Sequence, residues 1–198
     1  MSELWATSDD LTAKARIRNA ALELLATQGE GNTTMRAVAQ VAGVTPGLVI
    51  HHFGNKDGLR HAVERLVIER FQSALLAVPL NGSAAQVGPA RDASIARMLS
   101  EHPVLVDYVR RAMLDPQTGP ELLERMMDFT LEQVRELRAA GVATSTASET
   151  TQAISILFRQ LGHLLLQPML QHMWTYAGNA GPGDEQPPVV EVKLRPRH

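Results

Sequence analysis

Two adjacent histidines and a nearby lysine are the side chains of this chain whose types most directly suggest chemistry. His51 and His52 lie a few residues before Lys56. Paired imidazoles can bind a metal ion or act as an acid–base pair. Neighbouring residues of a helix point about 100° apart, however, so this pair cannot easily hold one ion. The sequence also places no third ligand nearby, so we favour a different role for the histidines and expect no bound metal.

The known catalytic patterns are missing from the sequence. It has no Gly-x-Ser-x-Gly, no phosphate-binding loop, no dinucleotide fingerprint and no repeated Glu-x-x-His. The 198 residues contain no cysteine, which excludes a disulfide scaffold and thiolate metal sites. We therefore expect no enzymatic activity and no cofactor.

The elements that position the histidines are predicted by caps and apolar spacing. A helix is expected over about 12–27, followed by helices at 35–42 and 46–53 and a fourth from about 55 to 77. Thr33 or Thr34 can cap the second of these, Thr45 can cap the third, and Pro46 suits a first helical turn.

The second and third predicted helices have the spacing of a helix-turn-helix. Ala39 is small enough for close packing, Gly43 permits the turn, and Val49 packs back onto the preceding helix. Such a motif inserts the N-terminal end of its second helix into the major groove of DNA. A helical hairpin that binds no nucleic acid has the same spacing and stays open as an alternative.

The charge distribution agrees with a polyanionic partner but supports it only weakly. The net charge is −2. Residues 11–65 carry seven Lys or Arg and four acidic residues, a net charge of +3. The basic part of the chain is therefore the part that contains the helix-turn-helix.

The remainder of the sequence predicts a larger helical domain. Helices are expected at about 90–101, 103–114, 120–140 and 147–175, with residues 78–90 as a connection. The last helix is apolar on nearly every side, so it should lie in a core or a subunit interface, and Pro168 should kink or divide it.

The N-terminus and the apolar runs of the sequence favour a soluble, cytoplasmic protein. The first ten residues are acidic and polar, unlike a signal peptide, and no apolar run is long enough to cross a bilayer. We expect an all-α fold with a helix-turn-helix domain at 11–60, a ligand-binding and dimerisation domain at 61–176 and a flexible tail at 177–198. The last ten residues of that tail are an extended arm, a frayed end or a segment that reaches a partner subunit.

The stretch TTMRAVAQVAGVTPGLVIHHFGNKDGL resembles the DNA-binding signature of the TetR family of transcriptional regulators. The similarity includes the T-x-x-x-[VI]-A opening, the A-G-V turn, the [HY]-F end of the recognition helix and the following N-K-x-x-L. It covers about a third of the chain. The resemblance implies a homodimer that binds a palindromic operator and a repression that a small molecule relieves.

The resemblance also implies roles for individual residues. Thr34 and Lys56 match positions that contact phosphates, Arg36 matches a position that can reach a base edge, and the two histidines match an aromatic pair that lies against phosphates. The sequence departs from the family where Pro46 replaces a polar residue and Ile50 replaces a tyrosine. Apolar contacts from Pro46 or Leu48 to thymine methyl groups are then expected to carry more of the readout. The expected DNA-binding residues are Thr34, Arg36, Thr45, Pro46, Gly47, Leu48, His51, His52 and Lys56.

Methionine and aromatic residues of the C-terminal helices could form an adaptable wall for a largely apolar effector. Arg159 and His163 lie four residues apart on an apolar helix and therefore share a face. Ordinary core packing is an alternative role for the methionine and aromatic residues. For Arg159 and His163, the alternative is a pair that is hydrogen-bonded within a subunit interface. We expect Arg110 and Arg111 to be solvated surface. The expected effector-binding residues are Tyr108, Met126, Met127, Phe129, Phe158, Arg159 and His163.

These observations predict a ligand-responsive transcriptional regulator, most simply a repressor. Its expected partners are double-stranded DNA, a small-molecule effector and a second copy of the chain, with no membrane. The alternative is a TetR-like helical module that binds a ligand or a protein without specific DNA binding.

Overall fold

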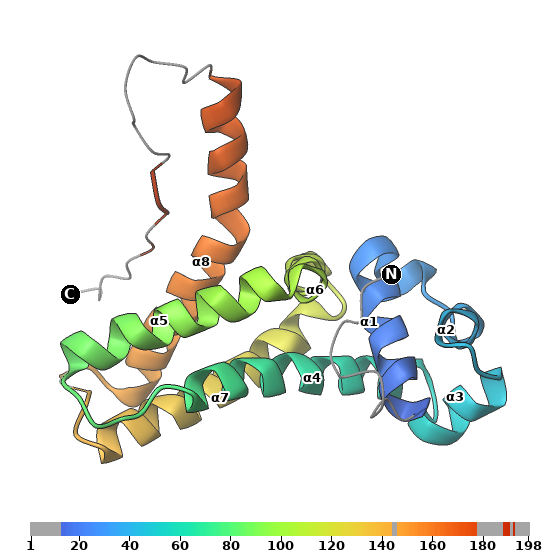
Figure 1. Cartoon of the computed structure of the whole chain (residues 1–198), viewed down its shortest axis with the longest axis horizontal. Helices are drawn as coiled ribbons and strands as arrows, with labels where there is room; N and C mark the ends of the chain where they lie inside the picture. The colour runs from blue at the N-terminus through green and yellow to red at the C-terminus, as the bar shows by residue number, and fades with distance from the viewer. Residues whose placement is uncertain (1–12, 144–145, 178–187, 191, 193–198) are drawn as a thin grey trace. The chain divides into compact units, whose positions relative to one another are not determined.

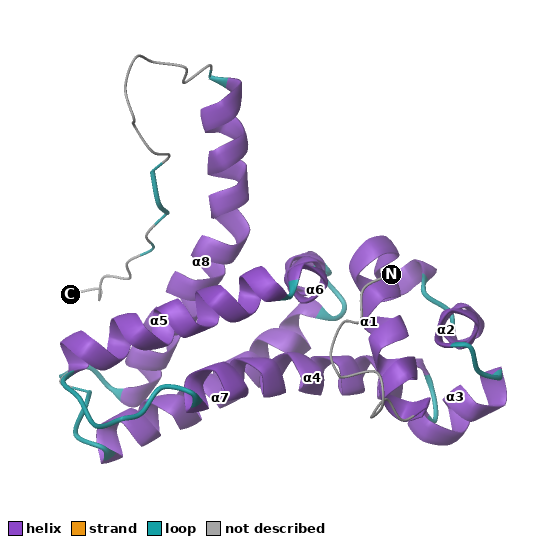
Figure 2. Ribbon diagram, in the orientation of Figure 1, coloured by secondary structure: helices purple, strands orange, loops and turns teal. Residues whose placement is uncertain are grey.

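The computed structural model describes residues 13–143, 146–177, 188–190 and 192, and in these residues the regular secondary structure is entirely α-helical (Figure 2). The predicted all-α fold is therefore confirmed. Within this described part, no helix has both the length and the apolar character needed to cross a membrane. The chain forms two compact units that divide between Leu122 and Leu123. The functional boundary at residues 60 and 61 stays a prediction.

The helix-turn-helix of the first unit consists of α2 (Met35–Ala42) and α3 (Pro46–Phe53), with the predicted bounds (Figure 1). The Oγ1 atom of Thr34 accepts a hydrogen bond from the Ala37 amide at 3.1 Å. The Oγ1 atom of Thr45 accepts one from the Leu48 amide at 3.3 Å. Each threonine thereby satisfies an amide that the first turn leaves unpaired. Gly43 ends α2 in the left-handed region, at φ 66°.

Helix α1 (Ala13–Asn32) is longer than the sequence predicts. We expected it to end near Thr27, before the two glycines. Gly29 does leave helical geometry, at φ 77° and ψ 173°, but helical hydrogen bonding resumes after it. The expected end of the helix is thus a kink, and one more helical turn follows it.

Helices α4 (Lys56–Leu76), α5 (Ala84–Glu101) and α6 (Pro103–Leu114) complete the first unit. Helix α1 packs against α2, α4 and α6, and α4 packs against α5 (Figure 1). The predicted start of α5 near residue 90 is wrong. The helix starts at Ala84 because Ser83 and Gln86 form a capping box, and it includes Pro89.

The second unit contains most of α7 (Gly119–Ala139) and all of α8 (Glu149–Tyr176). Nε of Arg135 lies 3.2 Å from a carboxylate oxygen of Glu149, and Nε of Arg138 donates a hydrogen bond to Gln152 at 3.0 Å. These contacts connect the end of α7 to the start of α8. Pro168 lies inside α8 without dividing it.

Helix α8 has a buried apolar face and an exposed apolar face. The buried face contains Ala153, Leu157, Leu161 and Leu164. Five large side chains on the other face are 44–87 % exposed, and we call them the exposed stripe: Phe158, Leu166, Met169, Met173 and Tyr176. Among the described residues, the side chains of the exposed stripe thus stay largely uncovered.

Candidate nucleic-acid interface

Helix α3 is fixed to the first unit by one face and leaves its other face at the surface. Val49 is fully buried and Phe53 is 9 % exposed, so these two side chains anchor the helix. Six of the nine predicted DNA-binding residues are exposed, namely Thr34, Arg36, Thr45, Pro46, Gly47 and His51. The remaining three, Leu48, His52 and Lys56, are half-buried.

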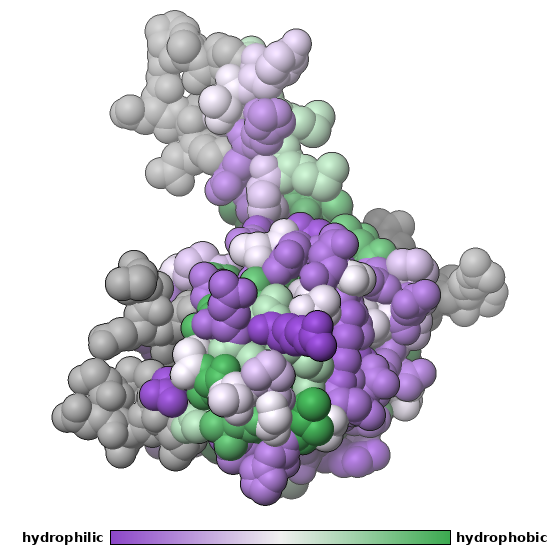
Figure 3. Space-filling model, turned by 90° about the vertical axis from the view of Figure 1, so that its right-hand side faces the viewer, coloured by the Kyte–Doolittle hydropathy of each residue, from purple (hydrophilic) through white to green (hydrophobic). Residues whose placement is uncertain are grey.

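The surface that carries α2 and α3 combines apolar and polar side chains (Figure 3). Val41 is 51 % exposed and Ile50 is 53 % exposed, which is unusual for large aliphatic residues. Ile50 and the exposed Pro46 are the two positions where the sequence departs from the family signature. This face therefore offers apolar groups for contact with a partner beside the exposed polar side chains of Arg36, Thr45 and His51.

The two histidines stand edge to face. Their ring centroids are 5.3 Å apart with an interplanar angle of 66°, and the His52 and Phe53 centroids are 6.2 Å apart. The row of rings runs from the buried Phe53 to the exposed His51. The anchoring of α3 thus also orients the histidine pair.

Lys56 has a partner within the first unit. Its Nζ donates a hydrogen bond to the backbone carbonyl of Glu30, in the last turn of α1. The start of α4 is thereby connected to the end of α1. The phosphate contact that we expect of Lys56 stays a prediction, and this bond adds a structural role.

A buried ion-pair network surrounds Arg60, one turn beyond Lys56. Arg60 is 7 % exposed and Glu64 is fully buried. Nη1 of Arg60 lies 2.6 Å from Oε1 of Glu64, and Nη2 lies 2.9 Å from Oε2 of Glu121. Glu30 approaches Nε at 3.5 Å. Arg60 therefore connects α4 with the end of α1 and the start of α7.

The charge of Arg60 is maintained by its partners. Burial disfavours the charged guanidinium, but hydrogen bonds and charges from Glu121 and Glu64 outweigh this and raise the pKa of Arg60. The apolar periodicity of α4 did not reveal this network. The spacing of Arg60 and Glu64, four residues apart on a buried helix, is the signal that could have indicated it.

The carboxylates of this network and the neighbouring His61 also have the composition of a metal site. Ligand atoms of His61, Glu64 and Glu121 lie within 4.8 Å of one another. The guanidinium of Arg60 already pairs with both carboxylates, however, and His61 Nε2 lies 2.8 Å from Glu121. A divalent cation would have to displace a fixed positive charge, so this arrangement fits an ion-pair network better.

Arg111 is exposed, as expected, but its guanidinium is also bonded to α1. Its Nε donates to the carbonyl of Ala26 at 3.0 Å, and its Nη2 donates to the carbonyl of Thr27 at 3.1 Å. Helix α6 is therefore bonded to the end of α1. The acceptors lie more than 80 residues away in the sequence, so no local pattern indicates this contact.

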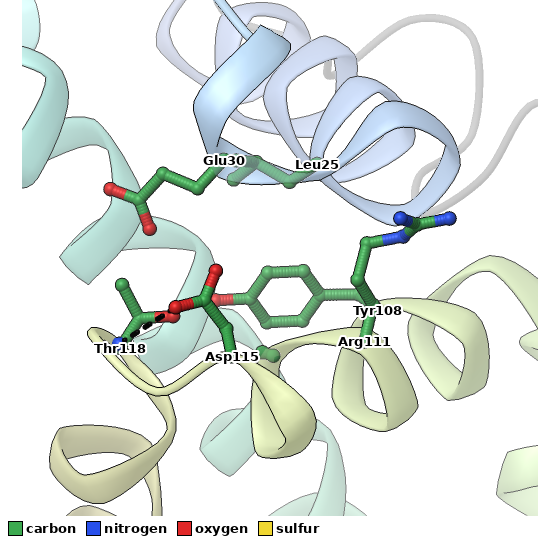
Figure 4. Close-up of a pocket in the computed structure, with 7 residues that line it drawn as sticks. Leu25, Glu30, Tyr108, Arg111, Asp115 and Thr118 are labelled. Carbon is green, nitrogen blue, oxygen red and sulfur yellow. Dashed lines mark hydrogen bonds between the residues drawn. The ribbon is translucent and has the colours of Figure 1, made fainter.

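A small cavity lies beside these bonds (Figure 4). Its volume of about 20 Å³ has room for about one water molecule and none for an organic effector. The carboxyl groups of Glu30 and Asp115 both point toward the gap, which Tyr108 also lines (Figure 4). Burial raises the pKa of Glu30, although Arg60 and Lys56 oppose the shift and Asp115 adds to it.

The predicted effector-binding residues are distributed over both units. Tyr108 belongs to the first unit and is 3 % exposed, whereas the other six belong to the second. Met126 is buried, and Phe158 and His163 are exposed. The remaining three, Met127, Phe129 and Arg159, are half-buried. Their role in effector binding stays a prediction.

Comparison with known proteins identifies the N-terminal helices. Residues 17–63 match the family model described as bacterial regulatory proteins, tetR family. This range contains the whole helix-turn-helix and the first turns of α4. These N-terminal helices belong to the TetR family. The resemblance seen in the sequence is thereby confirmed.

The similarity to one known regulator extends beyond the helix-turn-helix. The chain is 37 % identical over 139 residues to the HTH-type transcriptional regulatory protein RaaS of Mycobacterium tuberculosis. The match covers 70 % of this chain and 61 % of RaaS. The chain therefore spans less than two thirds of the length of that relative.

Solved structures show the same TetR fold. A TetR family transcription regulator from Shewanella sp. PV-4 superposes with a TM-score of 0.68 at 21 % identity, covering 85 % of this chain and 92 % of that one. The multidrug binding protein EbrR in complex with malachite green gives a TM-score of 0.55 at 24 % identity and covers 79 % and 87 %. At these identities the likeness concerns the fold alone.

Proposed function

We propose that this chain is a ligand-responsive transcriptional regulator of the TetR family that binds a palindromic operator as a homodimer. The observation that carries the proposal is the helix-turn-helix itself. Helix α3 is anchored through Val49 and Phe53, and its N-terminal residues are exposed. A short helix that presents its first turn in this way fits the major groove.

The chemistry of the exposed residues suggests how DNA is recognised. Arg36 carries a planar guanidinium that can bond guanine O6 and N7. Thr45 and Gly47 allow a close approach to the DNA, and Pro46 and Ile50 offer apolar contacts to thymine methyl groups. Phosphate contacts from Thr34 and the histidines would fix the register without selecting a sequence.

The proposed homodimer rests on the exposed stripe of α8. Phe158, Met169 and Met173 are 47, 61 and 67 % exposed on a helix whose opposite face is already buried. An apolar surface of this extent commonly marks an interaction site. A second copy would supply the same stripe, which is the arrangement that two-fold symmetry requires.

Regulation would act through the last turns of α1, on both sides of the Gly29 kink. Lys56 and Arg60 of α4 contact Glu30 after the kink, and Arg111 of α6 bonds to carbonyls before it. A displacement of α4 or α6 would therefore move the helix-turn-helix, and with it the spacing of two recognition helices on DNA. An effector produces such a shift only by binding the two states unequally.

The effector class is part of the proposal. Methionine and aromatic residues on α7 and α8 suit a largely apolar small molecule. The relative in fold EbrR binds malachite green, an organic dye, and this supports the choice of ligand class. Tryptophan fluorescence with a panel of hydrophobic dyes would test it.

A footprint on the DNA upstream of the protein's own gene tests the proposal. We expect a protected region with two-fold symmetry, with half-sites one helical turn or a multiple of it apart. A protein that binds all DNA equally would support the alternative, a helical module without specific DNA binding. The few hydrogen-bond donors on α3 are the feature that favours this alternative.

A further inference from the structure

The C-terminal segment of the chain, here residues 188–190 and 192, lies against α8. The side-chain Nε2 of Gln167 donates a hydrogen bond to the carbonyl of Pro188 at 3.1 Å. Its Oε1 accepts a hydrogen bond from the amide of Val190 at 2.8 Å. One amide group thus pairs with both peptide groups that flank Val189, as a neighbouring β-strand would.

Gly162 provides the second contact of the C-terminal segment. A Cβ atom placed on Gly162 would overlap Cγ2 of Val192. Glycine is a poor helix former, and inside a helix it usually has a packing reason. Here the reason is the close approach of Val192. Because Pro188 lies at Gln167 and Val192 lies at Gly162, the segment runs antiparallel to α8.

We call Gly162 and Gln167 the seat of the segment. Gly162 lies within the exposed stripe, whereas Gln167 lies about 140° around the helix from it. Phe158 and Leu166 are one helical turn before and after Gly162, and Met169 is two turns after it, so all four share one side of α8. The buried Leu157, Leu161 and Leu164 lie on the other side. Val192 therefore covers the part of the exposed stripe at Gly162, on the surface where a second copy would pack.

We propose that the C-terminal segment and the α8 of a second copy compete for this seat, so that the segment limits the strength of the dimer. The inference rests on the homodimer under the proposed function. Packed helices approach to about 8–10 Å between axes. Val192 occupies that space above Gly162, so the segment must leave before the stripes of two copies can meet.

The length of the chain permits this release. Ten residues separate Ala177, at the end of α8, from Pro188, and the eleven Cα–Cα steps between these two residues can span roughly 36 Å. The return from the end of α8 to Gln167 covers only about 15 Å of helix. The segment can therefore leave its seat without unwinding α8.

Two substitutions in the full chain test the competition, and a third is the matched control. Gly162→Ala places a methyl group where Val192 lies, and Gln167→Ala removes both hydrogen bonds. Val189→Ala changes the same segment at a side chain that is 72 % exposed and is expected to change nothing. Hydrogen exchange at the Val190 amide reports whether the segment is seated, and sedimentation equilibrium gives the dimer Kd.

We expect both seat variants to accelerate exchange at Val190 and to tighten the dimer on the order of tenfold, the change that 1.4 kcal/mol produces. A looser or unchanged dimer in variants that have released the segment would overturn the competition while leaving the homodimer intact. If neither the parent nor any variant dimerises, the proposed homodimer fails and the competition fails with it. Rapid exchange at the Val190 amide in the parent chain would show that the segment does not bind at Gly162 and Gln167. That result would overturn the competition and leave the homodimer untouched.

Discussion

Arg60 and Glu64 lie one turn apart on α4 and form a 2.6 Å ion pair that is almost entirely removed from water. Arg60 also pairs with the carboxylates of Glu121 and Glu30. Glu64, in contrast, joins this network through its ion pair with Arg60. The two residues are therefore not equivalent, and their substitutions should differ.

Arg60→Met should lower the free energy of unfolding by about 3–5 kcal/mol, because it leaves Glu64 buried without its counter-charge. Glu64→Leu should cost less, because Arg60 keeps Glu121 at 2.9 Å. The double variant Arg60→Met/Glu64→Leu should be more stable than Arg60→Met. Urea unfolding of the four proteins measures this, and strictly additive losses would contradict the coupling.

The adjacent arginines of α6 provide a matched pair. Arg111→Ala removes two charge-assisted hydrogen bonds to α1 and should cost on the order of 1–3 kcal/mol. Arg110→Ala removes an exposed contact to Asp107 and should stay within about 0.5 kcal/mol of the parent. Urea midpoints compare the two, and equal effects would show that the bonds to α1 contribute no stability.

Glu30 should make stability depend on pH. Its pKa is raised in the folded chain, so between the usual carboxyl value and the raised value the folded state holds a proton that the unfolded state has lost. Stability therefore falls as pH rises through that window. Glu30→Gln should flatten this part of the profile, and the exposed Glu23→Gln should not. An unchanged slope in Glu30→Gln would assign the effect to another group.

The DNA-binding residues should separate into two classes. Arg36→Ala should relax base preference at particular operator positions by roughly 1–3 kcal/mol. Lys56→Ala should weaken binding to all sequences and reduce the salt slope by about one. Gel shifts over a salt series measure both effects. Arg97→Ala, which removes an exposed charge on α5, is the control, and identical behaviour of Arg36→Ala and Lys56→Ala would refute the division.

Local chemistry explains which elements the sequence could predict. The bounds of α2, α3 and α6 follow from Thr34, Thr45 and the helix-starting prolines, which act within one turn of the residues they fix. The start of α5 was missed because Gly88 and Pro89 suggest a connection, whereas Ser83 and Gln86 begin the helix before them. Residues that usually end a helix thus lie inside α5, because the capping box formed by Ser83 and Gln86 starts the helix before them.

The contacts around the candidate interface depend on the tertiary fold and could not be predicted. Arg111 reaches α1 across more than 80 residues, and Lys56 reaches Glu30 across 26. The seat of Val192 on Gly162 is a contact of the same long-range kind. The sequence shows that these residues exist, but only the packing of the helices determines which atoms meet.

The bonds that Arg111 and Lys56 make to the last turns of α1 all end on backbone carbonyl oxygens, those of Ala26, Thr27 and Glu30. Every amino acid supplies the same acceptor. Substitutions at these three acceptor positions would keep the bonds as long as the helix persists. Related chains could therefore diverge in this part of α1 during evolution while they retain the same attachment of the DNA-binding helices.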